Sequence, residues 1–145
     1  MALVPKFNMA DVNKYIKGQQ ELIEQAIINR LKFVGEKFIR NARSNDTYKD
    51  RTGNLRSSIG YVIIKDGQQI SDFFPGNKPD GKAKGLKVAQ DAALKFPDGI
   101  VLICVAGMDY AAAVESNNYD VLTASSITAE EDLKRGLQEL KNKLQ

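Results

Sequence analysis

A long amphipathic pattern near the start of the chain limits the folds it can adopt. Between Met9 and Ala42, apolar residues recur at spacings of mostly three, four or seven positions and meet no proline. Such spacing places them on one face of an α-helix, here about 45–50 Å long. We expect Asp11 to be its N-cap, residues 44–46 to end it, and Gly18 to be a weak point where it could break. The apolar residues are Val12, Ile16, Ile23, Ile27, Leu31, Val34, Phe38 and Ala42.

Three strands are predicted after a polar connector over residues 45–54. Residues 59–65 and 68–74 flank Asp66-Gly67, a dipeptide that accepts the positive φ angles of a tight hairpin turn. Residues 100–106 form an uninterrupted apolar run, which is typical of a strand buried on both faces. We therefore expect this third strand at the centre of the sheet. A further short strand is a candidate over residues 119–123.

A basic loop and two more helices complete the predicted elements. Residues 75–87 are rich in proline, glycine and lysine, which predicts an exposed, flexible loop. A short helix is expected over residues 86–96, stopped by the proline and glycine that follow. A C-terminal amphipathic helix is expected over residues 128–144, with Thr128 and Glu131 at the spacing of a capping box.

The predicted element order lacks the strict strand–helix alternation of a doubly wound fold. We therefore expect one α+β domain over residues 1–145, in which long N-terminal and C-terminal helices pack on a small antiparallel sheet. The longest apolar run is far too short to cross a bilayer, and the first residues lack the apolar core of a signal peptide. Synthesis is expected to end in a cytoplasm.

The composition argues against an enzyme. Histidine is absent, which removes the usual general base, the usual zinc ligand and the histidine-dependent triads. With a single cysteine and no calcium-loop pattern, we expect neither a metal nor a cofactor. Cys104 lies in an apolar run and is expected to be a small buried hydrophobe. A nucleophile at Ser57 or Ser58 with a lysine base such as Lys65 finds no support in known signatures.

The most distinctive local sequence is the block from Asp50 to Ile59. Thr52 can cap a single helical turn, and Leu55 and Ile59 can anchor that turn to the core. Arg51 and Arg56 would then point outward. The alternative is a well-formed connector into a strand with no contact role.

Two further segments are candidate contact surfaces. The segment 75–87 carries four lysines against one aspartate, a local charge of +3 that equals the formal net charge of the chain, +3. Lysines without aromatic neighbours suit non-specific attraction to phosphate or to an acidic protein face, or serve only as a solvated loop. In the segment 107–115, Tyr110 and Glu115 flank small alanines, which indicates a subunit surface or a tight internal contact. The four lysines are Lys78, Lys82, Lys84 and Lys87.

Three short blocks carry a resemblance to a known family. They are Arg-Thr-Gly-Asn-Leu-Arg-Ser-Ser-Ile at 51–59, Gly-Met-Asp-Tyr-Ala at 107–111 running into Val114-Glu115, and Tyr-Asp-Val-Leu-Thr at 119–123. After a long amphipathic helix, these blocks resemble the tail-completion or head-tail joining (neck) proteins of long-tailed bacteriophages, of the minor tail protein Z type. The likeness spans roughly residues 31–140. One departure is Ala113, where the family leads us to expect a bulky aromatic residue.

The resemblance implies a non-catalytic α+β protein of the virion neck. Such a protein is added to the end of a finished tail, in a ring whose lumen passes DNA, so that the tail can dock on the connector of a filled head. Its partners would be tail tube, terminator and connector proteins, with no membrane, and it would assemble in the host cytoplasm. The four lysines would face DNA or an acidic neighbour. The implied subunit contacts are Arg51, Thr52, Asn54, Arg56, Tyr110 and Glu115. The alternative is a small accessory DNA-binding protein that uses the lysine-rich segment.

Overall fold

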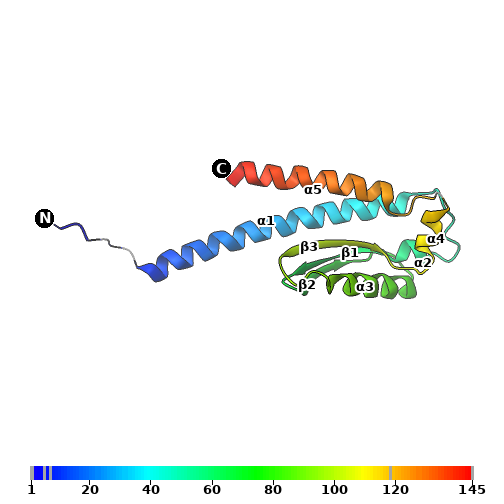
Figure 1. Ribbon diagram of the computed structural model, residues 1–145, viewed down its shortest axis with the longest axis horizontal. Helices are drawn as coiled ribbons and strands as arrows, with labels where there is room; N and C mark the ends of the chain where they lie inside the picture. Colours follow the sequence, from blue (N-terminus) through cyan, green and yellow to red (C-terminus); the bar gives the residue numbers. More distant parts are fainter. Residues whose placement is uncertain (1, 5, 7, 118, 145) are drawn as a thin grey trace.

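The computed structural model describes residues 2–4, 6, 8–117 and 119–144 and has the expected α+β composition. The long helices at the two ends of the chain lie side by side on one side of a small antiparallel sheet (Figure 1). The elements in chain order are α1 (Met9–Ser44), α2 (Asn54–Ser57), β1 (Ile59–Lys65), β2 (Gln68–Phe73), α3 (Pro79–Ala93), β3 (Ile100–Ala106), α4 (Ala111–Ser116) and α5 (Thr123–Leu144).

Helix α1 is unbroken over 36 residues, so the expected break at Gly18 does not occur. Its N-cap is Asn8, whose side-chain oxygen accepts a hydrogen bond from the Ala10 amide at 2.8 Å. Asp11, which we expected to be the cap, lies instead in the first turn. An acidic side chain is also favourable there, because the N-terminal end of a helix carries partial positive charge.

The strand order is β2-β1-β3, with both pairs antiparallel. The Asp66-Gly67 turn has positive φ at both residues, 49° and 81°, which confirms the predicted hairpin. The prediction that β3 forms the sheet centre is wrong, because β1 holds that place and β3 is an edge strand. The hairpin occupies one side of β1, so β3 can pair only along its other side. An apolar run does not by itself distinguish these two positions.

The two faces of β1 are covered by different helices. Tyr61 and Ile63 face the cluster that includes Phe38 of α1, while Val62 and Ile64 pack with Ala89 of α3. This division follows from the two-residue period of a strand. Helix α5 packs on α1, which gives four layers in the order α5, α1, sheet and α3 (Figure 1).

The predicted loop over residues 75–87 is wrong from Pro79 onward, because α3 begins there. Proline is well suited to the first turn of a helix, where its missing amide proton is not needed. Gly81 and Gly85 are buried, and a β-carbon on them would collide with the carbonyl oxygens of Asn54 and Ser58 respectively. The glycines that indicated a mobile loop therefore allow close packing of a helix.

The C-terminal helix also begins earlier than predicted. The candidate strand over residues 119–123 is wrong, because residues 119–120 have no regular structure, residues 121–122 form a bend and α5 starts at Thr123. Thr128 lies inside the helix, where its hydroxyl donates to the Ala124 carbonyl at 3.2 Å, so the predicted capping box is wrong. Within the described residues, none of the helices has both the length and the hydrophobicity needed to span a membrane.

Candidate contact surface at the loop end

The short helices α2 and α4 and the connecting segments next to them lie at one end of the molecule, which we call the loop end. It comprises residues 45–57, with α2, and residues 107–117 and 119–122, with α4 (Figure 1, right). All three blocks that carry the family resemblance reach this end. The question is which of their side chains are exposed and which hold the loops together.

Asp50 organises the first block. Its two carboxylate oxygens accept hydrogen bonds from the backbone amides of Gly53, at 3.0 Å, and Arg56, at 2.7 Å. Gly53 precedes α2 with φ of 76°, a left-handed conformation that favours glycine. Thr52 accepts from the Asn54 amide at the longer distance of 3.3 Å, so the capping role we predicted for Thr52 belongs mainly to Asp50.

Arg56 faces inward, contrary to the prediction. Its guanidinium carbon lies 5.1 Å from the centre of the Tyr48 ring, and its Nη2 donates to the Asn45 carbonyl at 2.7 Å. Burial raises the pKa of Tyr48, although the neighbouring Arg56 opposes this shift. The Tyr48 phenol therefore remains neutral at physiological pH and forms an apolar support for the arginine.

Glu115 holds the start of α5. One carboxylate oxygen accepts from the amides of Val121, Leu122 and Thr123 at 3.0, 2.6 and 3.3 Å, and the other accepts from the Thr123 hydroxyl at 3.0 Å. Burial favours a raised pKa for Glu115, but these hydrogen bonds together hold the pKa below its usual value. Glu115 therefore acts within the chain.

Asn45 and Asp120 join the first and third blocks. The Asn45 side-chain amide donates to the carbonyl and to the carboxylate of Asp120 at 2.6 and 2.9 Å. Because Arg56 binds the Asn45 carbonyl, a chain of contacts runs from α2 to the start of α5. The loop end is thus one hydrogen-bonded unit built from segments far apart in the sequence.

The exposed side chains of this unit come from residues next to the internal anchors. Arg51 and Thr52 are exposed, as is Tyr110, with 40% of its surface accessible. Asn54 is partly buried beside them. The sequence-based contact set therefore divides into exposed residues and residues that support them.

The lysine segment 75–87 adjoins the block at residues 51–59 and the block at residues 107–111. Lys78 lies beside Gly53, where an added β-carbon would meet its side chain at 3.4 Å, and its amide donates to the Ser57 hydroxyl at 3.2 Å. Lys84 forms an ion pair with Asp109 at 3.1 Å. Lys82 and Lys87 are exposed on α3. The start of α3 thus extends the loop end with basic residues.

The serines offer no accessible nucleophile. Ser57 and Ser58 are 2% and 0% exposed. Ser58 donates to the Leu55 carbonyl at 2.7 Å and accepts from the Gly107 amide at 3.0 Å. Burial also raises the pKa of the Cys104 thiol to about 12, which keeps it protonated. In the described part of the chain, no group of three or more His, Cys, Asp or Glu residues could hold a metal ion.

Sequence reasoning missed the acidic and amide residues that organise the loop end. Asp50, Asn45 and Asp120 were assigned no role, although each accepts or donates several of the hydrogen bonds that join the loops. Asp50 precedes Gly53 by three positions, a turn spacing that could have revealed its part. The partners Asn45 and Asp120 lie too far apart in sequence for a local signal.

Comparison with known protein families, curated proteins and solved structures finds no match to this chain. The likeness to phage neck proteins therefore rests on the three short blocks.

Proposed function

We propose that this protein is a structural subunit of a tailed bacteriophage that completes the tail and joins it to the DNA-filled head, without catalytic activity. One observation supports the proposal above all. The three blocks that resemble the tail-completion family, separated by up to half the chain, meet in one hydrogen-bonded surface. Arg51 and Tyr110, which are exposed on this surface, belong to residue types that are enriched in protein interfaces.

The proposed contact residues are the exposed members of this surface. Arg51, Thr52 and Tyr110 would touch tail tube, terminator or connector proteins, since arginine and tyrosine contribute strongly to interface affinity. Asn54, Arg56 and Glu115 would act indirectly, by fixing the backbone that carries those three. In a ring on the tail end, Lys78, Lys82, Lys84 and Lys87 would face DNA in the lumen or an acidic neighbouring subunit. The protein would thus reside in the virion neck after assembly in the host cytoplasm.

The test is electron microscopy of lysates from the source phage or prophage with this gene interrupted. We expect full heads beside unattached tails, and restoration by a plasmid copy of the gene. Arg51→Glu should fail to restore joined particles, whereas Lys95→Glu, an exposed charge reversal at the far end of α3, should succeed. Normal, infectious particles without the gene would refute the joining role.

A second candidate function is that of an accessory DNA-binding protein. It is favoured by the exposed lysines at the start of α3, although Lys84 is already paired with Asp109. Phosphate-driven binding should weaken steeply between about 50 and 200 mM salt and should be lost when the four lysines become glutamate. Absence of binding to duplex DNA at about 50 mM salt would eliminate this candidate.

A further inference from the structure

Strand β3 is an edge strand whose outer side is open. At the two ends of its pairing with β1, the Gly107 amide donates to the Ser58 carbonyl and the Asp66 amide donates to the Gly99 carbonyl. Because the hydrogen-bonding direction alternates along a strand, the odd-numbered residues of β3 bond to β1 and the even-numbered ones point their amides and carbonyls outward. No hydrogen bond within the described residues reaches these outward groups. They belong to Ile100, Leu102, Cys104 and Ala106.

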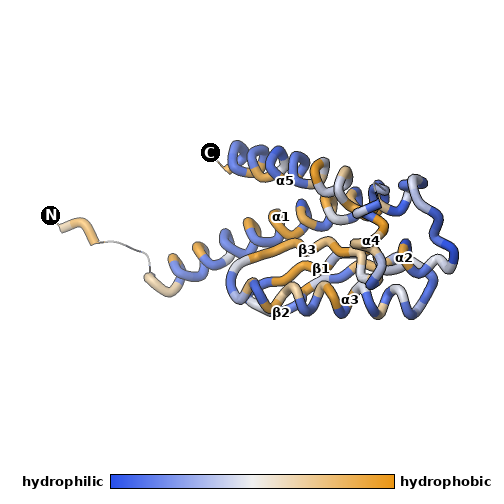
Figure 2. Tube along the Cα trace, turned by 45° about the vertical axis from the view of Figure 1, so that its right-hand side comes forward, coloured by the Kyte–Doolittle hydropathy of each residue, from blue (hydrophilic) through white to orange (hydrophobic). Residues whose placement is uncertain are grey.

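The other edge strand, β2, is protected against further pairing in ways that β3 is not. Its sequence is mainly polar and includes Asp72, and its register with β1 shifts between Ile63 and Ile64. Charged side chains and bulges are two devices that keep an exposed edge from pairing. Strand β3 has no charge, no proline and no register shift, and it is hydrophobic along its length (Figure 2). An open edge of this kind calls for another strand.

A groove of about 420 Å³ runs beside this open edge. It is lined by β3, by α1 with residues such as Leu31, and by α5 with residues such as Leu133. On the β3 side its lining includes Leu102 and Cys104, two of the residues whose backbone groups point outward. A strand added to β3 would therefore bond to those groups and place every second side chain in the groove. We call this hollow the edge groove.

The chain carries a segment suited to the edge groove. Residues 2–8 precede α1, and we call them the N-terminal arm. Its described residues have no regular secondary structure, and the arm projects from the body of the molecule (Figure 1). Leu3 and Val4 are 97% and 76% exposed. Successive side chains of an extended segment point to opposite sides, so either side of the arm offers an apolar residue to a groove.

The arm cannot reach the edge groove of its own chain. At 1.5 Å per residue, α1 carries the chain about 28 Å from Asn8 to Ile27, the first residue of α1 that lines the groove, and about 35 Å to Leu31. Seven fully extended residues span at most about 25 Å. An arm that lies along β3 must therefore come from another molecule.

We propose that the N-terminal arm of one copy adds as a fourth strand to β3 of another copy and fills its edge groove. Donor and acceptor surfaces differ, so the contact is head-to-tail and can close into a ring. Glu130 is the one charged side chain of the described lining and Lys6 is the one charged side chain of the arm, so the two have opposite charge. Proline is compatible with an outermost strand, so Pro5 does not prevent the pairing. This contact goes beyond the proposed joining role.

Sedimentation equilibrium compares the full chain with a chain that begins at Met9. We expect the full chain to associate with a dissociation constant between about 1 µM and 1 mM, and the shorter chain to associate at least about tenfold more weakly. Leu3→Asp and Val4→Asp together should have the same effect, because one of the two charges would enter the apolar groove. Leu94→Asp, at a residue that is 84% exposed after α3, is the matched control and should leave association unchanged. Circular dichroism verifies that each variant is folded.

Hydrogen exchange followed by NMR locates the contact on β3. The Ile103 and Val105 amides bond to β1 and should exchange slowly in every state, whereas those of Leu102 and Cys104 should exchange quickly in the monomer. In the associated full chain, protection of the Leu102 and Cys104 amides should rise at least about tenfold. Removal of the arm should abolish this rise.

A chain that stays monomeric at about 1 mM would overturn the inference. Association that survives removal of the arm would overturn it too, and protected Leu102 and Cys104 amides in that chain would show that β3 pairs with β3 of a second copy. Association that needs the arm but leaves those amides unprotected would place the arm on another surface and would equally overturn it. None of these outcomes bears on head–tail joining, which the lysates test separately.

Discussion

At the scale of single residues, carboxylates hold the loop end together. Asp50, Glu115 and Asp120 each accept hydrogen bonds from backbone amides at or near a helix start. The first amides of a helix have no partner within it, so each acceptor satisfies groups that would otherwise lose hydrogen bonds on burial. The exposed contact residues depend on these acceptors for their positions.

Replacing Glu115 with alanine should lower the free energy of unfolding by about 1–3 kcal/mol, because several amide donors at the start of α5 lose their acceptor. Urea titration followed by circular dichroism measures this change. Glu131→Ala, at an exposed carboxylate on α5, is the control and should stay within about 0.5 kcal/mol of the wild type. Equal effects of the two variants would contradict the assigned role of Glu115.

The same carboxylate should make stability depend on pH. The hydrogen bonds hold the folded-state pKa of Glu115 below its unfolded value, so its contribution is present above an unfolded pKa of about 4.3 and is lost as pH falls through the folded pKa. The stability difference between the wild type and Glu115→Gln should therefore shrink as pH falls below about 4. Urea titrations from neutral to acidic pH measure it. A difference that stays constant with pH would show that Glu115 has the same pKa in the folded and unfolded states.

At the scale of elements, the sequence predicts best those features that repeat locally. The long amphipathic stripe correctly predicted α1, and the Asp66-Gly67 dipeptide correctly predicted the hairpin. The start of α3 could not be predicted in this way, because Gly81 and Gly85 serve contacts with Asn54 and Ser58 rather than chain flexibility. At the loop end, Arg51 and Tyr110, which are exposed, could be predicted as candidate contact residues from the sequence. The inward turn of Arg56 depends on Tyr48 and Asn45, which only the fold brings near.

Gly85→Ala should destabilise the protein although alanine favours helix. The new methyl group would collide with the Ser58 carbonyl and the Phe74 ring, and overpacking of this kind typically costs about 1–3 kcal/mol. Thermal unfolding measures the change. Gly18→Ala is the contrasting control, since its methyl group meets open space and only helix propensity operates, so stability should be unchanged or higher. A neutral Gly85→Ala would show that α3 can shift away from α2.

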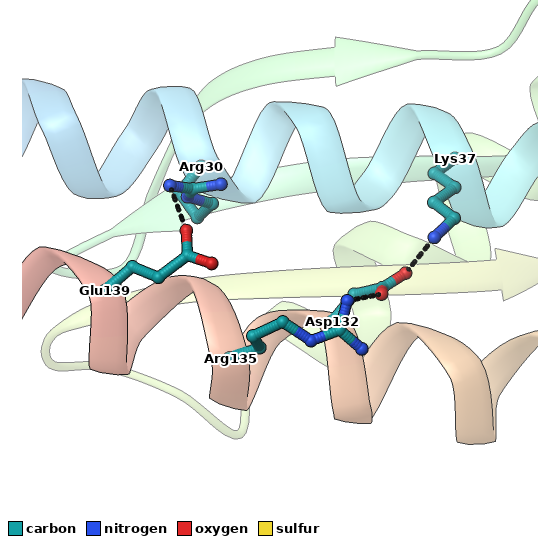
Figure 3. Close-up of polar contacts among 5 residues, drawn as sticks. All are labelled: Arg30, Lys37, Asp132, Arg135 and Glu139. Atoms are coloured by element: carbon teal, nitrogen blue, oxygen red, sulfur yellow. Dashed lines mark hydrogen bonds and ion pairs between the residues drawn. The ribbon is translucent and has the colours of Figure 1, made fainter.

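The contact between α1 and α5 includes two ion pairs of different burial (Figure 3). The Asp132 side chain is only 9% exposed and pairs with Lys37 of α1 at 2.7 Å; within α5 it also pairs with Arg135 at 3.5 Å. Glu139 is 52% exposed and pairs with Arg30 at 3.2 Å. Asp132→Ala should cost about 1–3 kcal/mol, because the nearly buried Asp132 carboxylate is little screened by water, whereas Glu139→Ala should cost less than about 1 kcal/mol, because the Glu139 carboxylate is exposed. Urea titration measures both. The reverse order would mean that packing, not charge, decides this contact.

At the scale of the whole molecule, the two ends differ in chemistry. The loop end is polar and internally hydrogen-bonded. At the opposite end, apolar side chains of α1 and α5 are exposed in a groove between the two helices. The sheet with its two covering helices lies between them and contains the core. We therefore expect the body to fold without the projecting first turns of α1.

A chain that begins at Gln19 should test this division directly. The removed turns of α1 contribute nothing to the core clusters, so the free energy of unfolding should stay within about 1 kcal/mol of the wild type. Helical ellipticity should fall by the amount expected for the missing turns. Urea titration followed by circular dichroism measures both effects. Loss of more than about 3 kcal/mol would place the first turns of α1 in the folding core.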